Sequence, residues 1–320
     1  MRCTEAIRHI PSRYAADAAE GLACHPTEPE RDMIPYEVEY LRAGSVQQAL
    51  AALAQHPEAK ILAGGHTLLP MMKLRLARPG LLVDIGRLPE LRGIVVHEDS
   101  VSIGSATTHA ELEASAALKQ LAPLFPLAAT VIADPTVRNR GTIGGALVHA
   151  DPSADWPAVA LAMDAEMEVV GAHGSTRIPA HEFFAGFMAT AVEPDEILTR
   201  IHVPLPAPGR VAYRKFRHPS SGYAVAAAAV AISVGKDGYA WGRIAITGVA
   251  DTAFRAWEAG ALLEGSFSDL PGKVDAIVEA AFANVTPLAD NFADGAYRLQ
   301  LGRVMLKRAL ADALEPPGAS

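Results

Sequence analysis

AGGHT, residues Ala63 to Thr67, stands between two short apolar segments. The run Lys60-Ile61-Leu62 before it is typical of a buried strand, and residues 68–77 after it indicate a short apolar helix. Because glycine has no Cβ, Gly64 and Gly65 would allow a phosphate to approach several backbone N–H groups closely. A Gly-Gly pair is also common in ordinary tight turns, so this stretch needs support from elsewhere in the chain.

A second glycine-rich stretch, Thr142-Ile143-Gly144-Gly145, follows the polar run Arg138 to Gly141. Two glycine turns that face each other would suit a diphosphate, whose negative charge is spread over two phosphate groups. The sequence has neither G-x-G-x-x-G after a strand nor G-x-x-x-x-G-K-[ST]. The Rossmann and P-loop types of nucleotide site are therefore disfavoured.

The composition indicates a globular protein of about two domains, since the chain has 320 residues, of which 50% are apolar and 20% charged. The net charge of −8 disfavours a nucleic-acid-binding surface, which normally carries a basic patch. No stretch approaches the ~18 uninterrupted apolar residues that indicate a membrane span. We expect neither nucleic-acid binding nor a membrane-spanning segment.

Both cysteines, Cys3 and Cys24, lie before Met33, so the rest of the chain has no thiol. That part cannot hold an iron–sulfur cluster or a zinc ion through cysteine, and it has no disulfide framework. The N-terminus lacks the apolar core of a signal peptide, which predicts a cytoplasmic protein. Residues 1–32 show no clear hydrophobic period, and we interpret them as an N-terminal extension.

Hydrophobic patterns and turn residues divide the remainder into helices and strands. Helices are predicted at residues 46–56, 108–118, 123–133, 153–163, 253–263, 272–282 and 296–314. Strands are predicted at residues 60–63, 81–85, 94–96, 101–103, 166–171, 176–178, 196–204, 211–216, 225–234 and 241–248. The proline-rich stretch from Pro204 to Gly209 is the best linker, so we place a domain boundary after residue 208. Strands followed by helices predict an α+β domain at residues 209–320.

Two longer stretches resemble a known family: AGGHTLLPMMKLRLARPGLLVDIGRLPEL, from Ala63, and TIGGALVHADPSADWPA, from Thr142. They are similar to the flavoprotein (medium) subunit of the molybdenum hydroxylases, which include carbon monoxide dehydrogenase and xanthine dehydrogenase. The resemblance implies an FAD-binding α/β domain of the vanillyl-alcohol-oxidase (PCMH-like) type at residues 33–208. Its two subdomains would span about 33–90 and 91–208, ahead of the C-terminal sheet-plus-helices domain.

In that family the two glycine loops bind the FAD diphosphate through backbone amides. The resemblance therefore implies that two groups of residues bind the cofactor in this chain. They are Ala63, Gly64, Gly65, His66 and Thr67 in the first loop, and Thr142, Ile143, Gly144 and Gly145 in the second. The family usually has Asn after TIGG, where this chain has Ala146. One polar contact near the phosphate or the ribityl chain would then be missing.

Two further side chains match family positions at the flavin. Asp155 corresponds to a residue that contacts the ribityl chain, but it is equally a helix N-terminal acid that interacts favourably with the helix dipole. Tyr223 is a candidate for stacking on the isoalloxazine ring, or else the edge of a core strand. Lys215 and Arg217 would either place positive charge near the reduced flavin or form a solvated strand face. We predict no catalytic side chain and no metal site.

By resemblance, the chain binds FAD non-covalently, while molybdopterin and the [2Fe-2S] clusters sit on a large and a small partner subunit in a dimer of heterotrimers. Electrons would pass from the clusters through this chain to a quinone, NAD or dioxygen. The lack of cysteines after residue 32 agrees with this division. Two alternatives stay open: a stand-alone flavin oxidoreductase, and a flavin-free assembly subunit, which Ala146 would favour.

Overall fold

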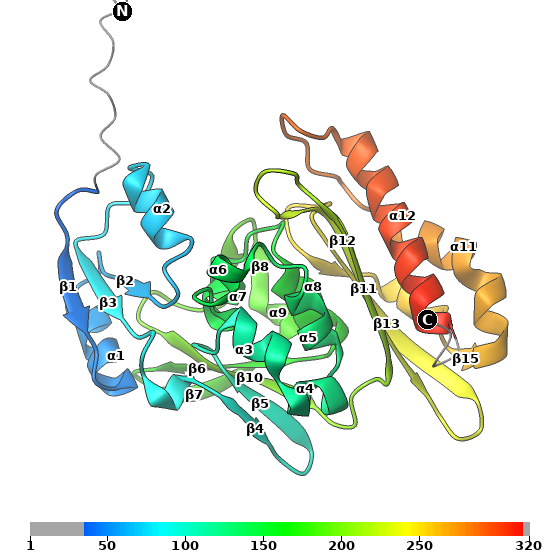
Figure 1. The fold of residues 1–320 in the computed structure, drawn as a ribbon, viewed down its shortest axis with the longest axis horizontal. Helices are drawn as coiled ribbons and strands as arrows, with labels where there is room; N and C mark the ends of the chain where they lie inside the picture. The colour runs from blue at the N-terminus through cyan, green and yellow to red at the C-terminus, as the bar shows by residue number, and fades with distance from the viewer. Residues whose placement is uncertain (1–34, 316–320) are drawn as a thin grey trace, which may run out of the picture.

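A computed structural model describes residues 35–315, so the predicted extension at residues 1–32 lies outside the described part. The first unit is a small parallel sheet in the strand order β1-β3-β2 (Figure 1). Its elements are β1 (Glu39–Arg42), α1 (Val46–Gln55), β2 (Lys60–Leu62), α2 (Leu68–Lys73) and β3 (Leu81–Asp84). The predicted start of this helix at residue 46 is confirmed, and the Ser45 side chain caps it by accepting a hydrogen bond from the Gln48 N–H.

The second unit is an antiparallel five-stranded sheet in the order β4-β5-β10-β6-β7. A short 3₁₀ helix, η3 (Pro89–Leu91), leads into it. The strands are β4 (Ile94–Val96), β5 (Ser100–Gly104), β6 (Glu166–Gly171), β7 (Gly174–Pro179) and β10 (Ile197–Pro204). The chain between β5 and β6 forms α3 (His109–Ala114), α4 (Ala116–Leu121), α5 (Leu124–Ala129), α6 (Pro135–Arg138), α7 (Ile143–His149) and α8 (Asp155–Ala162). After β7 come α9 (Ala180–Phe183), β8 (Phe184–Gly186) and β9 (Ala189–Thr190).

Side chains alternate across this sheet, as the strand period requires. Ile103, Ile201 and Met167 are fully buried in a core that also includes Leu147 and Trp156. The neighbouring Ser102, His202 and Glu168 are polar, and they hydrogen-bond to one another on the opposite face. The two faces of one sheet therefore differ: the first packs against helices, and the second carries titratable side chains.

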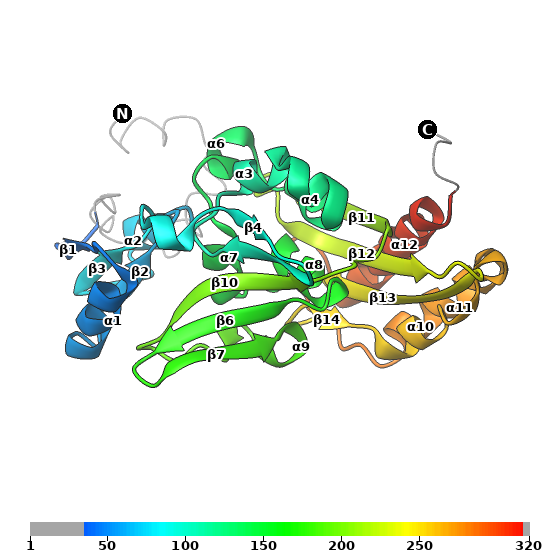
Figure 2. The ribbon, with the colours of Figure 1, turned by 90° about the horizontal axis from the view of Figure 1, so that it is seen from below.

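The third unit is an antiparallel sheet with three long strands, β11 (Arg210–Arg217), β12 (Ala224–Val234) and β13 (Tyr239–Thr247). The short strands β14 (Phe254–Arg255) and β15 (Gly265–Ser266) pair with β13. The remaining elements are α10 (Trp257–Ala261), η4 (Phe267–Asp269), α11 (Leu270–Phe282) and α12 (Gly295–Leu314). Figure 2 shows α12 and α11 on one side of this sheet and the α3–α8 region on the other.

The alanine-rich sequence of β12 follows from its position between two helical layers. Ala227, Ala229 and Ala231 belong to the core shared with α8, whereas Ala226 and Ala228 belong to the core under α12. Since both faces are covered, the strand reads as a continuous apolar run rather than an alternating one. Small side chains let the layers approach closely.

The predicted helix at residues 108–118 is wrong in one respect: the structure has two short helices there. The predicted start is confirmed, because Thr108 and Glu111 form a reciprocal capping box. Ser115 then adopts an extended conformation, with φ −62° and ψ 115°, and its side chain caps α4 by accepting from the Leu118 N–H. The serine hydroxyl competes with helix continuation at this position.

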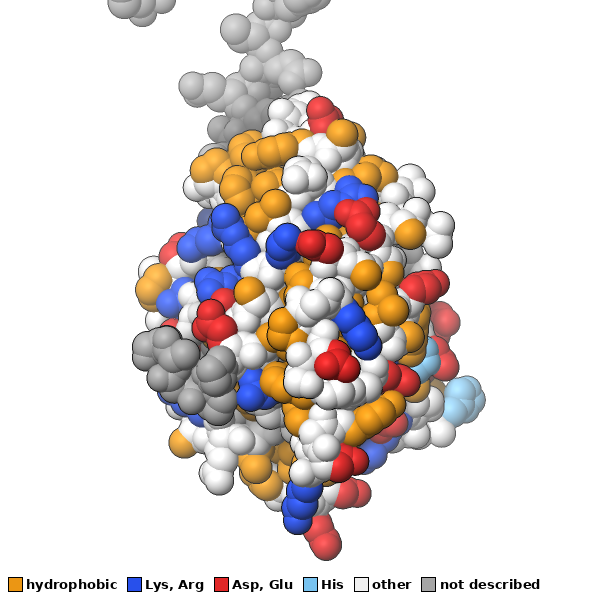
Figure 3. Space-filling model, turned by 90° about the vertical axis from the view of Figure 1, so that its right-hand side faces the viewer, with side chains coloured by type: hydrophobic (Ala, Val, Ile, Leu, Met, Phe, Trp, Pro, Cys, Tyr) orange, Lys and Arg blue, Asp and Glu red, His pale blue; other side chains and the backbone are white. Residues whose placement is uncertain are grey.

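The end of the molecule formed by α11 and α12 carries acidic and basic side chains interspersed (Figure 3). Lys307 pairs with Asp275 at 2.7 Å, and Arg303 lies 3.5 Å from Glu279. This face has no patch of one sign of charge. Within residues 35–315, no helix is long and apolar enough to cross a membrane.

Candidate cofactor site

The two glycine loops predicted to act together lie in direct contact. A Cβ on Gly64 would come within 2.3 Å of the Arg140 carbonyl oxygen and 2.9 Å of the Gly141 Cα. A Cβ on Gly145 would lie 4.0 Å from the Ala63 Cβ. Glycine at position 64 is therefore required for the loops to meet, and the structure brings the AGGHT and TIGG stretches together.

The first loop exposes a run of free backbone donors. The carbonyl oxygens of Gly65 and Thr67 accept hydrogen bonds from the first turns of α2. Among residues 35–315, the N–H groups of Gly64, Gly65, His66 and Thr67 have no hydrogen-bond acceptor. Gly65 has φ +77°, the left-handed conformation that glycine adopts without strain. Consecutive free amides beside such a residue form a concavity that binds anions.

The second loop is organised differently from the prediction. The Ile143 and Gly144 N–H groups already donate to the carbonyl oxygens of Thr107 and Ser105, at 3.1 and 2.8 Å. The Gly145 N–H donates to the Thr142 hydroxyl at 3.2 Å, which caps α7. An anion could bind the Ile143 and Gly144 amides only if those bonds broke. Binding of the cofactor by Thr142, Ile143, Gly144 and Gly145 stays a prediction.

Tyr223 lies between the first loop and the third unit. It directly precedes β12, and its side chain is 39% exposed, so it is not a core residue. Burial raises the pKa of its phenol, the Asp151 carboxylate raises it further, and the Thr67 side chain acts in the opposite direction. The phenol thus shares its surroundings with Thr67 of the AGGHT loop. This position is compatible with contact to a flavin, and stacking stays a prediction.

Asp155 is confirmed as an acid in the first turn of α8. Its carboxylate accepts hydrogen bonds from the Tyr213 hydroxyl at 2.6 Å and from Lys215 Nζ at 2.7 Å. Burial raises the pKa of this carboxyl, while the lysine and the tyrosine oppose that shift. Both strand residues are partners that the sequence interpretation missed, because no local pattern links residues 155 and 215. Contact between Asp155 and a ribityl chain stays a prediction.

The interpretation of Lys215 as part of a solvated strand face is wrong. Only 1% of its side chain is exposed, and the ammonium group is buried against Asp155. Alternation along β11 turns this side chain toward the α5 and α8 helices, where it also donates to the Val131 carbonyl oxygen. Arg217 is exposed and donates to the Ala133 carbonyl oxygen at 3.1 Å. The buried pair joins the second unit to the third.

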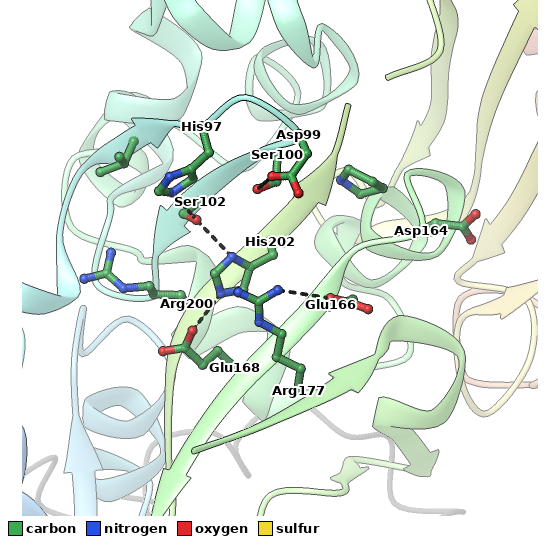
Figure 4. A pocket seen from close by; sticks show the side chains of 12 residues that line it. His97, Asp99, Ser100, Ser102, Asp164, Glu166, Glu168, Arg177, Arg200 and His202 are labelled. Carbon is green, nitrogen blue, oxygen red and sulfur yellow. Dashed lines mark hydrogen bonds and ion pairs between the residues drawn. The ribbon is translucent and has the colours of Figure 1, made fainter. Parts of the chain in front are cut away.

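A cavity of about 640 Å³ lies on the sheet face opposite to the helices (Figure 4). A chain of hydrogen bonds crosses it, from His97 through the Ser102 hydroxyl to His202, and from His202 to Glu168. Burial would raise the pKa of Glu168, but hydrogen bonds from His202 and Thr199 outweigh this effect and lower it. None of the eleven cofactor-binding residues predicted from the sequence lines this cavity, and we assign no ligand to it.

Family models match most of the chain. The model described as "FAD binding domain in molybdopterin dehydrogenase" matches residues 36–206. The model described as "CO dehydrogenase flavoprotein C-terminal domain" matches residues 211–313.

Individual proteins are also similar over nearly their whole length. The chain is 42% identical over 286 residues to the carbon monoxide dehydrogenase medium chain of Hydrogenophaga pseudoflava, covering 87% of this chain and 97% of that one. It is 36% identical to a subunit of the 6-hydroxypseudooxynicotine dehydrogenase complex of Paenarthrobacter nicotinovorans, covering 88% and 96%. The solved carbon monoxide dehydrogenase of Hydrogenophaga pseudoflava superposes with a TM-score of 0.82 at 41% identity, covering 88% and 98%.

Proposed function

We propose, because the chain belongs to the FAD-binding medium subunits of the molybdenum hydroxylases, that it carries electrons from iron–sulfur clusters on a partner chain to an external acceptor. The chain is a subunit of an oxidoreductase, and FAD is the cofactor of its family. Its relatives belong to enzymes named for different substrates, among them carbon monoxide, nicotine and caffeine. This variety supports the proposal that the substrate is decided by another subunit.

The observation that carries the proposal is the fit of the first loop to a diphosphate. The free N–H groups of Gly64, Gly65, His66 and Thr67 form a donor set for phosphate oxygens, and Gly145 lies next to Ala63 at the start of this loop. FAD, when bound, supplies a ring that takes up electrons singly or in pairs. The residues of this chain hold the diphosphate, position the ring and set its electrostatic surroundings.

The part of the chain that the structure describes has no cysteine, the usual ligand of an iron–sulfur cluster. Both cysteines precede residue 33, and residues 35–315 contain no cluster of three or more His, Cys, Asp or Glu side chains suited to a metal. Clusters and molybdenum would then lie on other chains. We propose a molybdopterin-binding large subunit and a [2Fe-2S] small subunit as partners, assembled as a dimer of heterotrimers in the cytoplasm.

Co-purification tests this assignment. The full chain, tagged and expressed in a host that makes molybdopterin together with the neighbouring genes, is purified, and its flavin, molybdenum and iron contents are measured. We expect two further subunits, with molybdenum and iron present only in fractions that contain them. A chain that purifies alone with bound FAD and oxidises an organic substrate would instead be a stand-alone flavoenzyme.

A further inference from the structure

We propose that the buried imidazole of His109 is an additional cofactor-binding group, which donates a hydrogen bond from Nε2 to the diphosphate of FAD. This inference rests on the proposed seat of the diphosphate at the AGGHT loop. His109 is the first residue of α3 and follows the Thr108 cap. It was not among the residues predicted from the sequence.

The protonation state of this imidazole is fixed by a neighbour that can only donate. Trp156 Nε1 lies 3.1 Å from His109 Nδ1, and the two rings pack 5.6 Å apart. An indole N–H has no acceptor function, so Nδ1 carries the lone pair and the hydrogen of the neutral ring sits on Nε2. Burial lowers the pKa of His109 to about 4, with smaller contributions from His66 and Arg138. The ring is a neutral donor at physiological pH.

The Nε2 hydrogen has no acceptor among the described residues, although His109 is only 5% exposed. The Nε2 atom is not among the fully buried polar atoms that lack a partner, so this donor can be reached from outside the described part of the chain. The rest of the ring is buried, and its other nitrogen is held by Trp156. A fixed ring with one reachable donor is the observation that points to a ligand.

Nε2 lies at the contact between the two glycine loops. A Cβ on Gly141 would come within 2.7 Å of it, so only glycine leaves this nitrogen uncovered. Gly141 in turn touches Gly64, the first residue with a free amide in the AGGHT loop. His66 of the same loop is near enough to influence the pKa of His109. The imidazole and the free amides therefore converge on one site, and an anion there would receive a charge-assisted hydrogen bond.

Two substitutions separate a ligand donor from a merely structural role. His109→Asn keeps an acceptor near the Nδ1 position for Trp156 but removes the donor at the Nε2 position. His109→Gln keeps a donor near the Nε2 position but removes the acceptor for Trp156. Affinities of the full chain, stripped of flavin, are measured by calorimetry for FAD, for ADP and for riboflavin, which lacks the diphosphate.

We expect His109→Asn to weaken FAD and ADP binding roughly tenfold or more, the worth of a hydrogen bond to a charged group, and to leave riboflavin binding unchanged. His109→Gln should retain most of the affinity for FAD and ADP. Unchanged affinities in His109→Asn, or an equal loss for riboflavin, would overturn the proposal. Greater loss in His109→Gln than in His109→Asn would show that the histidine acts only through Trp156.

A spectroscopic measurement keeps the proposal testable if the variants do not fold. In wild-type protein with ¹⁵N-labelled histidine, the His109 Nε2–H resonance should stay that of a neutral ring from pH 5.5 to pH 8, about one unit or more above its lowered pKa. It should shift when ADP is added and not when riboflavin is added. A resonance that ADP leaves unmoved would contradict the proposal, whereas a wild-type chain that binds neither FAD nor ADP, alone or with its partner subunits, would rule out the proposed seat of the diphosphate itself.

Discussion

Gly64 and Gly141 are in van der Waals contact, since a Cβ on Gly64 would come within 2.9 Å of the Gly141 Cα. The contact joins the parallel sheet of the first unit to the helices of the second. The free amides of the AGGHT loop begin at Gly64 itself and continue through Thr67. The geometry of the cofactor site therefore depends on how closely two backbones approach at one point.

Gly64→Val should separate the two loops, because the new side chain would overlap the Arg140 carbonyl oxygen. We expect FAD content to fall at least tenfold and the free energy of unfolding to drop by about 1–3 kcal/mol, the usual cost of overpacking. Flavin absorbance per protein and urea unfolding measure the two effects. The control is Gly272→Ala, where a Cβ meets nothing within 4 Å. Full flavin content in Gly64→Val would refute the importance of this contact.

Lys215→Met should destabilise the fold strongly, because it leaves the Asp155 carboxylate buried without its charged partner. Breaking a buried ion pair lowers the free energy of unfolding by about 3–5 kcal/mol, which urea unfolding would measure. Adding Asp155→Asn to the same chain should restore part of the loss. The control Lys307→Met removes an exposed ion pair, in which 61% of the lysine side chain is accessible to solvent. This substitution should lower the free energy of unfolding by less than about 1 kcal/mol. Equal costs for the two lysines would contradict the structural assignment.

The stability of the flavin-free chain should rise with pH between about 4 and 6.5. In this window His109 binds a proton in the unfolded chain, where its pKa is about 6.5, but not in the folded chain, where burial lowers the pKa to about 4. The contribution of His109 to the free energy of unfolding is therefore complete above pH 6.5. It is lost as the pH falls toward 4, and the loss amounts to about 3 kcal/mol. Unfolding free energies of wild type and His109→Asn measured across the window should differ in slope, and identical slopes would exclude the effect.

Tyr223→Ala should change the flavin without unfolding the protein, since the side chain is 39% exposed and lies outside the core. If the phenol packs on the isoalloxazine ring, the visible absorption bands of bound FAD shift in this variant. The free energy of unfolding, measured by thermal denaturation, should change by less than ~1 kcal/mol, as for other surface substitutions. Tyr239→Ala is the control, because Tyr239 is 47% exposed at the far end of β13. Identical spectra for both variants would remove Tyr223 from the site.

Local patterns in the sequence predicted most of the elements, and the resemblance predicted the family. The caps at Ser45 and Thr108 and the long apolar run of β12 each depend on neighbouring residues, so they can be recognised without tertiary structure. The break at Ser115 could not be predicted this way, because serine is tolerated inside helices and the competing hydroxyl contact is a matter of geometry.

The partners within the site could not be predicted from sequence. Asp155 and Lys215 meet only because α8 packs against the long sheet, and the amides of Ile143 and Gly144 are taken by carbonyl groups of a preceding loop. His109 looked like an ordinary first-turn residue, since its tautomer depends on Trp156. Glycine loops indicated where a phosphate would sit, whereas packing decides which groups remain free to bind it.

The most direct test of the account is the absorption spectrum of the purified full chain, followed by acid release and mass identification of any chromophore. We predict a flavin spectrum and the release of intact FAD, because the free amides of the AGGHT loop and the family both indicate this cofactor. A chain that is colourless, and stays so when FAD and its partner subunits are added, would contradict the account and favour a flavin-free assembly subunit.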